Sequence, residues 1–159
     1  MSDNNNSAFN PEALEMADFR LVKGSIESPF DFDPEQVDGH KFELGFDLSF
    51  NMEDKLTKAD FQVQIGTNSK GENIEEAQGS FQFAFIFHVK NLEDLVKQNT
   101  DESTQVDGAL ANALAAISYS TARGILLTRF QGTALRNFIL PVINPNDLLY
   151  SDDTDSGKG

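Results

Sequence analysis

Two stretches of the chain alternate apolar and polar residues with the period of a β-strand. Residues 41–52 place an apolar side chain at every even position, and polar residues or glycine fill the positions between. Residues 80–89 repeat the pattern with phenylalanine on one face, but their opposite face also carries Ala84 and Ile86. The first stretch predicts a half-buried antiparallel strand. The second predicts a strand that is central in its sheet or covered by another subunit.

Two further strands are expected around residues 19–27 and 61–65. Gly24, inside the first of them, suggests a bulge or bend. Residues 28–40 contain two prolines and a glycine, so they predict an irregular crossover. The apolar side chains of this crossover either cover the core, which is the commoner role, or offer a contact surface.

The second half of the chain reads as helical. A short helix is expected after Asn91, and a longer one begins after a potential N-cap at Asp107. Apolar residues then follow helical spacing as far as Phe130, and Gly132 fits the helix end. Gly108 and Gly124 leave open whether this segment is one helix or two. Strands followed by helices predict an α+β fold, a four-stranded antiparallel sheet with helices packed on one face.

The length of 159 residues suits one domain. We expect a flexible N-terminal arm at residues 1–17, a folded domain at 18–150 and a disordered acidic tail at 151–159. No secretory signal and no membrane-spanning run is evident, and the chain has no cysteine. A cytoplasmic protein without membrane insertion is therefore expected.

The formal charge of −14 limits the partners of this chain. Such a surface repels phosphate backbones, which argues against nucleic-acid binding, and it favours encounter with basic partners. The charge can equally serve only to keep an apolar-rich protein dispersed.

The sequence offers no catalytic site. His40 and His88 are the only histidines, and neither has the pair of acidic residues at i+3 and i+4 that would favour a metal site. No glycine-rich phosphate loop and no hydrolase motif occurs. The acidic segment 151–157 lacks the final glutamate of a calcium loop. We therefore expect no enzyme activity, no cofactor and no metal.

The C-terminal half carries an ordered set of short motifs. These are Ala122-Arg123, Gly132-Thr133, the apolar run 138–140, Pro141-Val142, Asn144 and Asp147-Leu148-Leu149. With these motifs in this order, the chain resembles the SecB protein-export chaperones. The resemblance covers residues 19–149.

The resemblance implies an ATP-independent holdase that assembles as a homotetramer, a dimer of dimers. Such a protein binds unfolded preprotein clients in apolar grooves and delivers them to the SecA motor. By position, the groove candidates are Phe30, Phe32, Val37, Phe42, Leu44, Phe46, Tyr119 and Leu126. Plain core packing is the alternative role for each of them.

The chain also departs from the family. Glu27 matches one acidic position of the SecA-docking surface, but the other positions fall near Lys23 and His88, which are not acidic. Two alternative functions therefore stay open. One is a SecB-like chaperone of an antitoxin in a toxin–antitoxin system. The other is a non-chaperone assembly subunit that binds one folded partner.

Overall fold

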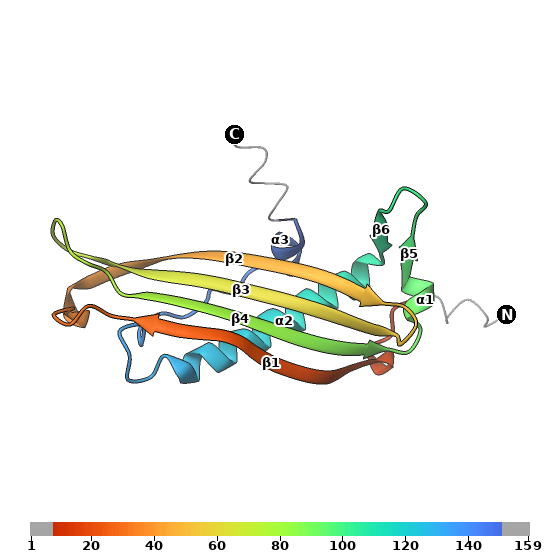
Figure 1. Ribbon diagram of the computed structural model, residues 1–159, viewed down its shortest axis with the longest axis horizontal. Coiled ribbons are helices and arrows are strands. Elements are labelled where there is room, and N and C mark those ends of the chain that lie inside the picture. Colours follow the sequence, from red (N-terminus) through yellow and green to blue (C-terminus); the bar gives the residue numbers. More distant parts are fainter. Residues whose placement is uncertain (1–7, 151–159) are drawn as a thin grey trace.

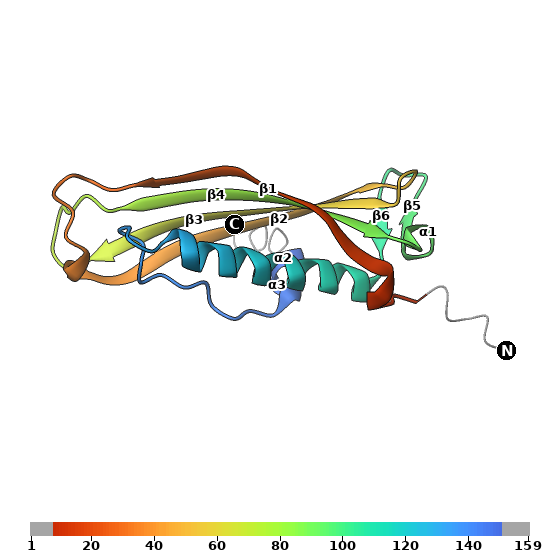
Figure 2. The ribbon, with the colours of Figure 1, turned by 90° about the horizontal axis from the view of Figure 1, so that it is seen from below.

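The computed structural model describes residues 8–150, which form a long antiparallel sheet with helices on one face. The strands lie in the order β1-β4-β3-β2. Their bounds are Leu14–Glu27 for β1, Val37–Asn51 for β2, Leu56–Ser69 for β3 and Gln78–Val89 for β4. Figure 1 looks onto the sheet with the long helix α2 behind it, and Figure 2 shows the two layers. The predicted α+β class is confirmed.

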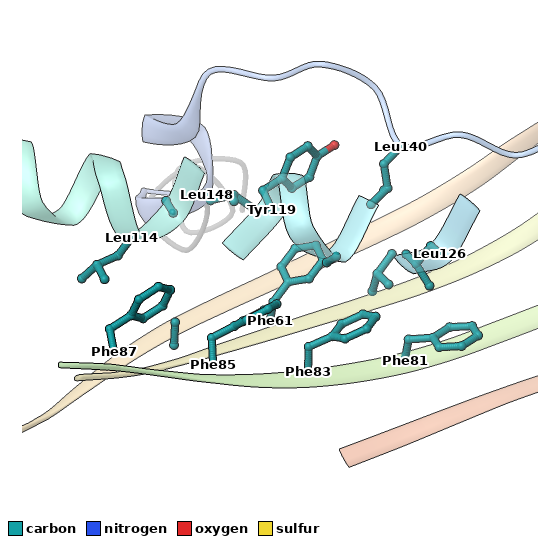
Figure 3. Packing of buried hydrophobic residues seen from close by; sticks show 14 of the residues in the cluster. Phe61, Phe81, Phe83, Phe85, Phe87, Leu114, Tyr119, Leu126, Leu140 and Leu148 are labelled. Carbon is teal, nitrogen blue, oxygen red and sulfur yellow. The ribbon is translucent and has the colours of Figure 1, made fainter. Parts of the chain in front are cut away.

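The core lies between β3, β4 and α2. β4 is a central strand, as its apolar faces predicted, and its phenylalanine rings at positions 81, 83, 85 and 87 stack in a row along the strand. Tyr119 of α2 packs edge-on against Phe61 of β3, with ring centroids 5.7 Å apart. Figure 3 shows these rings facing the leucines of α2. Their burial holds the helix against the sheet.

The long helix α2 spans Gly108–Arg129 without a break, which settles the question of one helix or two. Its N-cap is Asp107, whose Oδ2 accepts a hydrogen bond from the Leu110 amide at 3.1 Å. The helix ends before Gly132, which adopts a φ of +77°. Glycine reaches this left-handed conformation without the steric cost that a side chain adds.

Several boundaries differ from the expectation. β1 begins at Leu14, inside the segment expected to be a flexible arm, because Leu14 pairs with Val89 and its side chain joins the core. β2 begins at Val37, inside the expected crossover. The bulges of β1 lie between Met16 and Asp18 and between Leu21 and Lys23, not at Gly24 itself. Residues 1–7 of the expected arm and the expected tail 151–159 lie outside the described residues.

Three small features flank the long helix, and only the last of them was expected. A two-stranded hairpin pairs β5, Val96–Gln98, with β6, Thr104–Val106. A short helix α3, Pro145–Leu149, follows the apolar return segment and is capped by Asn144. The expected short helix after Asn91 is only one turn, α1, Leu92–Leu95.

Candidate functional site

The segment that leaves α2, residues 130–144, returns along the helix and alternates between core and surface. Leu135, Phe138 and Leu140 are buried, whereas Ile139 is 54% exposed and Val142 is 85% exposed. This return segment therefore joins the core through one row of side chains and presents a second apolar row outward.

Two side chains of α2 fix the return segment. The hydroxyl of Tyr119 donates a hydrogen bond to the carbonyl of Pro141, and Arg123 Nε donates one to the carbonyl of Leu140 at 2.7 Å. Burial raises the pKa of Tyr119 above its ordinary value of 10.0, and the nearby Arg123 charge opposes this effect. The hydroxyl thus stays protonated at neutral pH and keeps its role as donor.

The return segment also contacts strand β2. The Phe138 ring lies 5.2 Å from the His40 ring and 5.6 Å from the Phe42 ring, centroid to centroid. Phe42 stays 38% exposed, so this contact leaves an apolar surface at the side of the sheet. Burial lowers the pKa of His40 below 6.5, so its imidazole is neutral at pH 7.

A narrow cleft separates α2 from the return segment on the side away from the sheet. Its volume is about 100 Å³, and Ala116, Ser120, Val142 and Ile143 are among its lining residues. Tyr119 and Arg123 also line it, but both donate hydrogen bonds to the return segment, and the other lining residues are apolar or small. The cleft therefore suits an aliphatic side chain.

The crossover loop between β1 and β2 forms a second apolar surface. Phe30 is fully exposed, and Phe32 lines a hollow of about 470 Å³ between this loop and the β3–β4 hairpin. The hairpin contributes Ile74, and the amide of Lys70 donates to the carbonyl of Gln36 at 2.9 Å. Carboxylates of Asp31, Asp33 and Glu75 also line this hollow. An apolar surface bordered by negative charge results.

The structure divides the predicted groove residues into three groups. Phe30 and Phe42 are exposed, and Phe32 and Val37 are half-buried near the crossover. Leu44 and Phe46 are half-buried and pack against the core. Tyr119 and Leu126 are buried, with 6% and 2% of their surface exposed. In this conformation they pack in the core, which was the alternative to a role in the groove.

The sequence analysis did not name Ile139 and Val142 as groove candidates. Both lie in an apolar run, in which a uniform hydrophobic pattern hides which residues point outward. The available signal was that Ile139 and Val142 alternate along the chain with Phe138 and Leu140, which are buried.

Among residues 8–150, no helix covers the face of the sheet opposite α2 (Figure 2). Glu27 pairs across the strands with Gln78, Lys23 with Gln82 and His88 with Glu15. All of these residues are on this open face, because residues directly opposite one another in an antiparallel pair point to the same side. The three positions compared with the SecA-docking surface therefore lie on one face, but only Glu27 among them is acidic.

Within residues 8–150, no three histidine, cysteine or acidic residues are grouped closely enough to hold a metal ion. None of the helices in this range is long and apolar enough to cross a membrane. His40 lies against the return segment and His88 lies on the open face, so the two histidines occupy different sides of the sheet.

No protein-family model and no curated protein sequence matches this chain. Ten solved chains match it, and two of them illustrate the similarity. The SecB-like chaperone Rv1957 of Mycobacterium tuberculosis, in complex with a ChAD peptide from the Rv1956 HigA1 antitoxin, is 15% identical with a TM-score of 0.54. The match covers 83% of this chain and 92% of that one. A Streptococcus agalactiae protein of unknown function is 13% identical with a TM-score of 0.43, over 82% and 96% of the two chains. The chain has the SecB-like fold.

Proposed function

We propose that this chain is an ATP-independent holdase that binds apolar segments of unfolded clients. The observation that carries the proposal is the exposed apolar surface of the crossover loop and the return segment, which includes Phe30, Ile139 and Val142. An exposed apolar surface of this kind is expected of a site that covers part of another protein. The SecB-like fold and the lack of a catalytic motif support a binding role.

The charge of the protein agrees with such clients. Asp31, Asp33 and Glu75 lie beside Phe32 at the crossover, and the whole chain has a formal net charge of −14. Unfolded segments that combine apolar and basic side chains match both the apolar surface and the negative charge, whatever their exact sequence.

For the pathway, we propose that the clients are preproteins kept competent for export by the Sec pathway in the cytoplasm, with SecA as the receiving motor. Glu27 on the open face supports docking to SecA. The alternative, a chaperone of an antitoxin, is supported by the similar structure of Rv1957, which was solved with an antitoxin peptide.

We also propose a homotetramer. The outward side of α2 is built from small or uncharged residues such as Ala113, Ile117 and Ser120. Arg123 and Arg129 are the two charged residues of this helix, and Arg123 is engaged with Leu140. In a chain of charge −14, an uncharged helix face suits contact with the same helix of another copy.

The experiment is suppression of aggregation of a chemically unfolded model client without ATP, with solution mass measured on the same samples. Wild-type protein should suppress aggregation. The variant Phe30→Ser/Phe32→Ser should suppress it several-fold less at equal concentration while its mass is unchanged. Val22→Ser removes an exposed apolar side chain of β1 outside the site and serves as the control.

Equal suppression by Phe30→Ser/Phe32→Ser and wild type would exclude the crossover from client binding. No suppression by the wild-type protein would favour the assembly-subunit alternative. SecA can then be added to the same assay. It should release the client if the protein is an export chaperone, and the client should stay bound if the protein is a chaperone of an antitoxin.

A further inference from the structure

The narrow cleft between α2 and the return segment combines apolar walls with one charged side chain. Figure 2 shows the return segment running along α2 on the side away from the sheet. Arg123 supplies the charge of the cleft. The apolar part of its lining is Ala116, Val142, Ile143 and Pro145. The cleft can therefore hold an aliphatic group and an anionic group side by side.

The guanidinium of Arg123 is only partly engaged within the chain. Its Nε donates to the carbonyl of Leu140, but its two terminal amino groups make no hydrogen bond within residues 8–150. None of the ion pairs in this range includes Arg123. The chain has 26 acidic and only 12 basic side chains, so carboxylates for pairing are plentiful elsewhere. A half-buried guanidinium with free donors favours a carboxylate that comes from outside the chain.

A second donor and the apolar wall lie at matching positions along α2. Ser120 and Arg123 are three residues apart, so they are neighbours on one face of the helix. A long helical side chain points back toward the helix N-terminus, which brings the guanidinium toward the Ser120 hydroxyl. Ala116 lies one further turn, about 5.4 Å, along the helix axis. The anionic and aliphatic parts of a ligand are thus separated by about the length of one side chain.

We propose that this cleft binds the C-terminal residue of a partner protein, an aliphatic residue such as leucine or valine with its free α-carboxylate. Both groups of a terminal residue leave the same Cα, so both enter a cleft of about 100 Å³ together. Val142 lines the cleft and is 85% exposed, so the apolar surface continues beyond it. This continuation favours a polypeptide end with another apolar residue before it over a free small acid. Recognition of a chain end goes beyond the proposed holdase function, which needs no chain end.

The test uses full-length protein and three peptides that carry fluorescein at the N-terminus. The first is Gly-Ser-Gly-Val-Leu with a free C-terminal carboxylate, and the second is the same peptide with a C-terminal amide. The third is the rearranged Val-Leu-Gly-Gly-Ser with a free carboxylate. Fluorescence anisotropy at about 150 mM salt screens distant charges over about 8 Å.

Wild-type protein should bind the first peptide about threefold to tenfold more tightly than either of the others, as expected for one partly exposed charge pair. The net charge of −14 by itself disfavours the free acid relative to the amide. A preference for the acid therefore reports a local cation. Equal binding of the three peptides would overturn the proposal.

Variants of α2 separate the two parts of the site. Arg123→Gln should remove the preference for the acid over the amide, whereas Arg129→Gln removes the same charge outside the cleft and should keep it. Ala116→Leu fills the cleft and should weaken the first peptide to the level of the third, whereas Ala109→Leu lies outside the cleft and should not. An Arg123→Gln variant that loses acid and amide equally would show that Arg123 only positions the return segment, and would overturn the proposal.

Solution mass, measured with and without the first peptide, tests whether another copy covers the cleft. The mass should not change, and a fall on peptide binding would overturn the proposal. The result is also separable from client binding, because Phe30→Ser/Phe32→Ser should retain the peptide preference. Wild-type protein that prefers the acid but does not suppress aggregation would retain this site and lose the proposed holdase function. Suppression without the preference would overturn only the chain-end site.

Discussion

Gly79 of β4 faces Leu135 of the return segment. A Cβ at this position would stand 2.6 Å from Leu135 Cδ1, a distance that real side chains do not adopt, and Leu135 is fully buried. Gly79→Ala therefore forces Leu135 to move within the core. The substitution tests whether the return segment is seated as the structure shows.

The expected magnitude follows from two opposing effects. Overpacking of a core site costs about 1–3 kcal/mol. Alanine also restricts the unfolded chain, which stabilises the protein by about 0.4–1 kcal/mol. Gly39→Ala in β2 shares the second effect without the first, because no atom lies within 4 Å of its Cβ. The difference in free energy of unfolding between the two variants is then the cost of the clash, about 1–3 kcal/mol.

Equilibrium urea unfolding at one fixed protein concentration measures this difference. With a slope near 2 kcal/mol per molar urea, the midpoint of Gly79→Ala should lie about 0.5–1.5 M below that of Gly39→Ala. Leu135→Val shortens the opposing side chain, so the double variant Gly79→Ala/Leu135→Val should lose less stability than the two single losses together. Equal midpoints for the two alanine variants, or additive losses in the double variant, would refute the reasoning.

Three further predictions concern the helix, its neighbours and pH. Arg123→Ala removes a charged hydrogen bond worth about 1.5–3 kcal/mol, so hydrogen exchange of residues 138–144 should accelerate, whereas Arg129→Ala should leave it unchanged. If the protein is the proposed tetramer of four 17.6-kDa chains, Ile117→Glu places a charge on the outward face of α2 and should reduce the solution mass from roughly 70 kDa, whereas an unchanged mass would remove α2 from the assembly contact. Because burial lowers the pKa of His40 below 6.5, the unfolded chain takes up its proton first as pH falls. Wild-type stability should therefore decline more steeply than that of His40→Gln between pH 7.5 and 5.5, and parallel urea midpoints would contradict this cause.

The sheet could be predicted from sequence because strand faces depend on a period of two residues. The alternation in residues 41–52 and 80–89 placed each phenylalanine on the face that the structure gives it. The N-cap at Asp107 was equally local, since it needs only one side chain and the next turn of backbone. The hairpin of β5 and β6 was missed because its three-residue strands are too short to show a period.

The proposed client site was only partly predictable. Phe30 and Phe42 were identified by position and are exposed, but Tyr119 and Leu126 were assigned to the groove and lie in the core. Helical spacing marks an apolar stripe without telling which part of it meets the sheet. Val142 was overlooked for the related reason that its exposure depends on how Tyr119 and Arg123 hold the return segment.

By itself, the sequence determined the class of fold, the faces of its strands and the acidic, cysteine-free character of the chain, because these follow from composition and local periodicity. Strand order and register were decided only by the tertiary structure, since they depend on contacts between residues far apart in the chain. The same contacts bring Glu27 and Lys41 into one cross-strand row and leave Phe30 and Val142 uncovered. The proposed client-binding surface is therefore a product of packing.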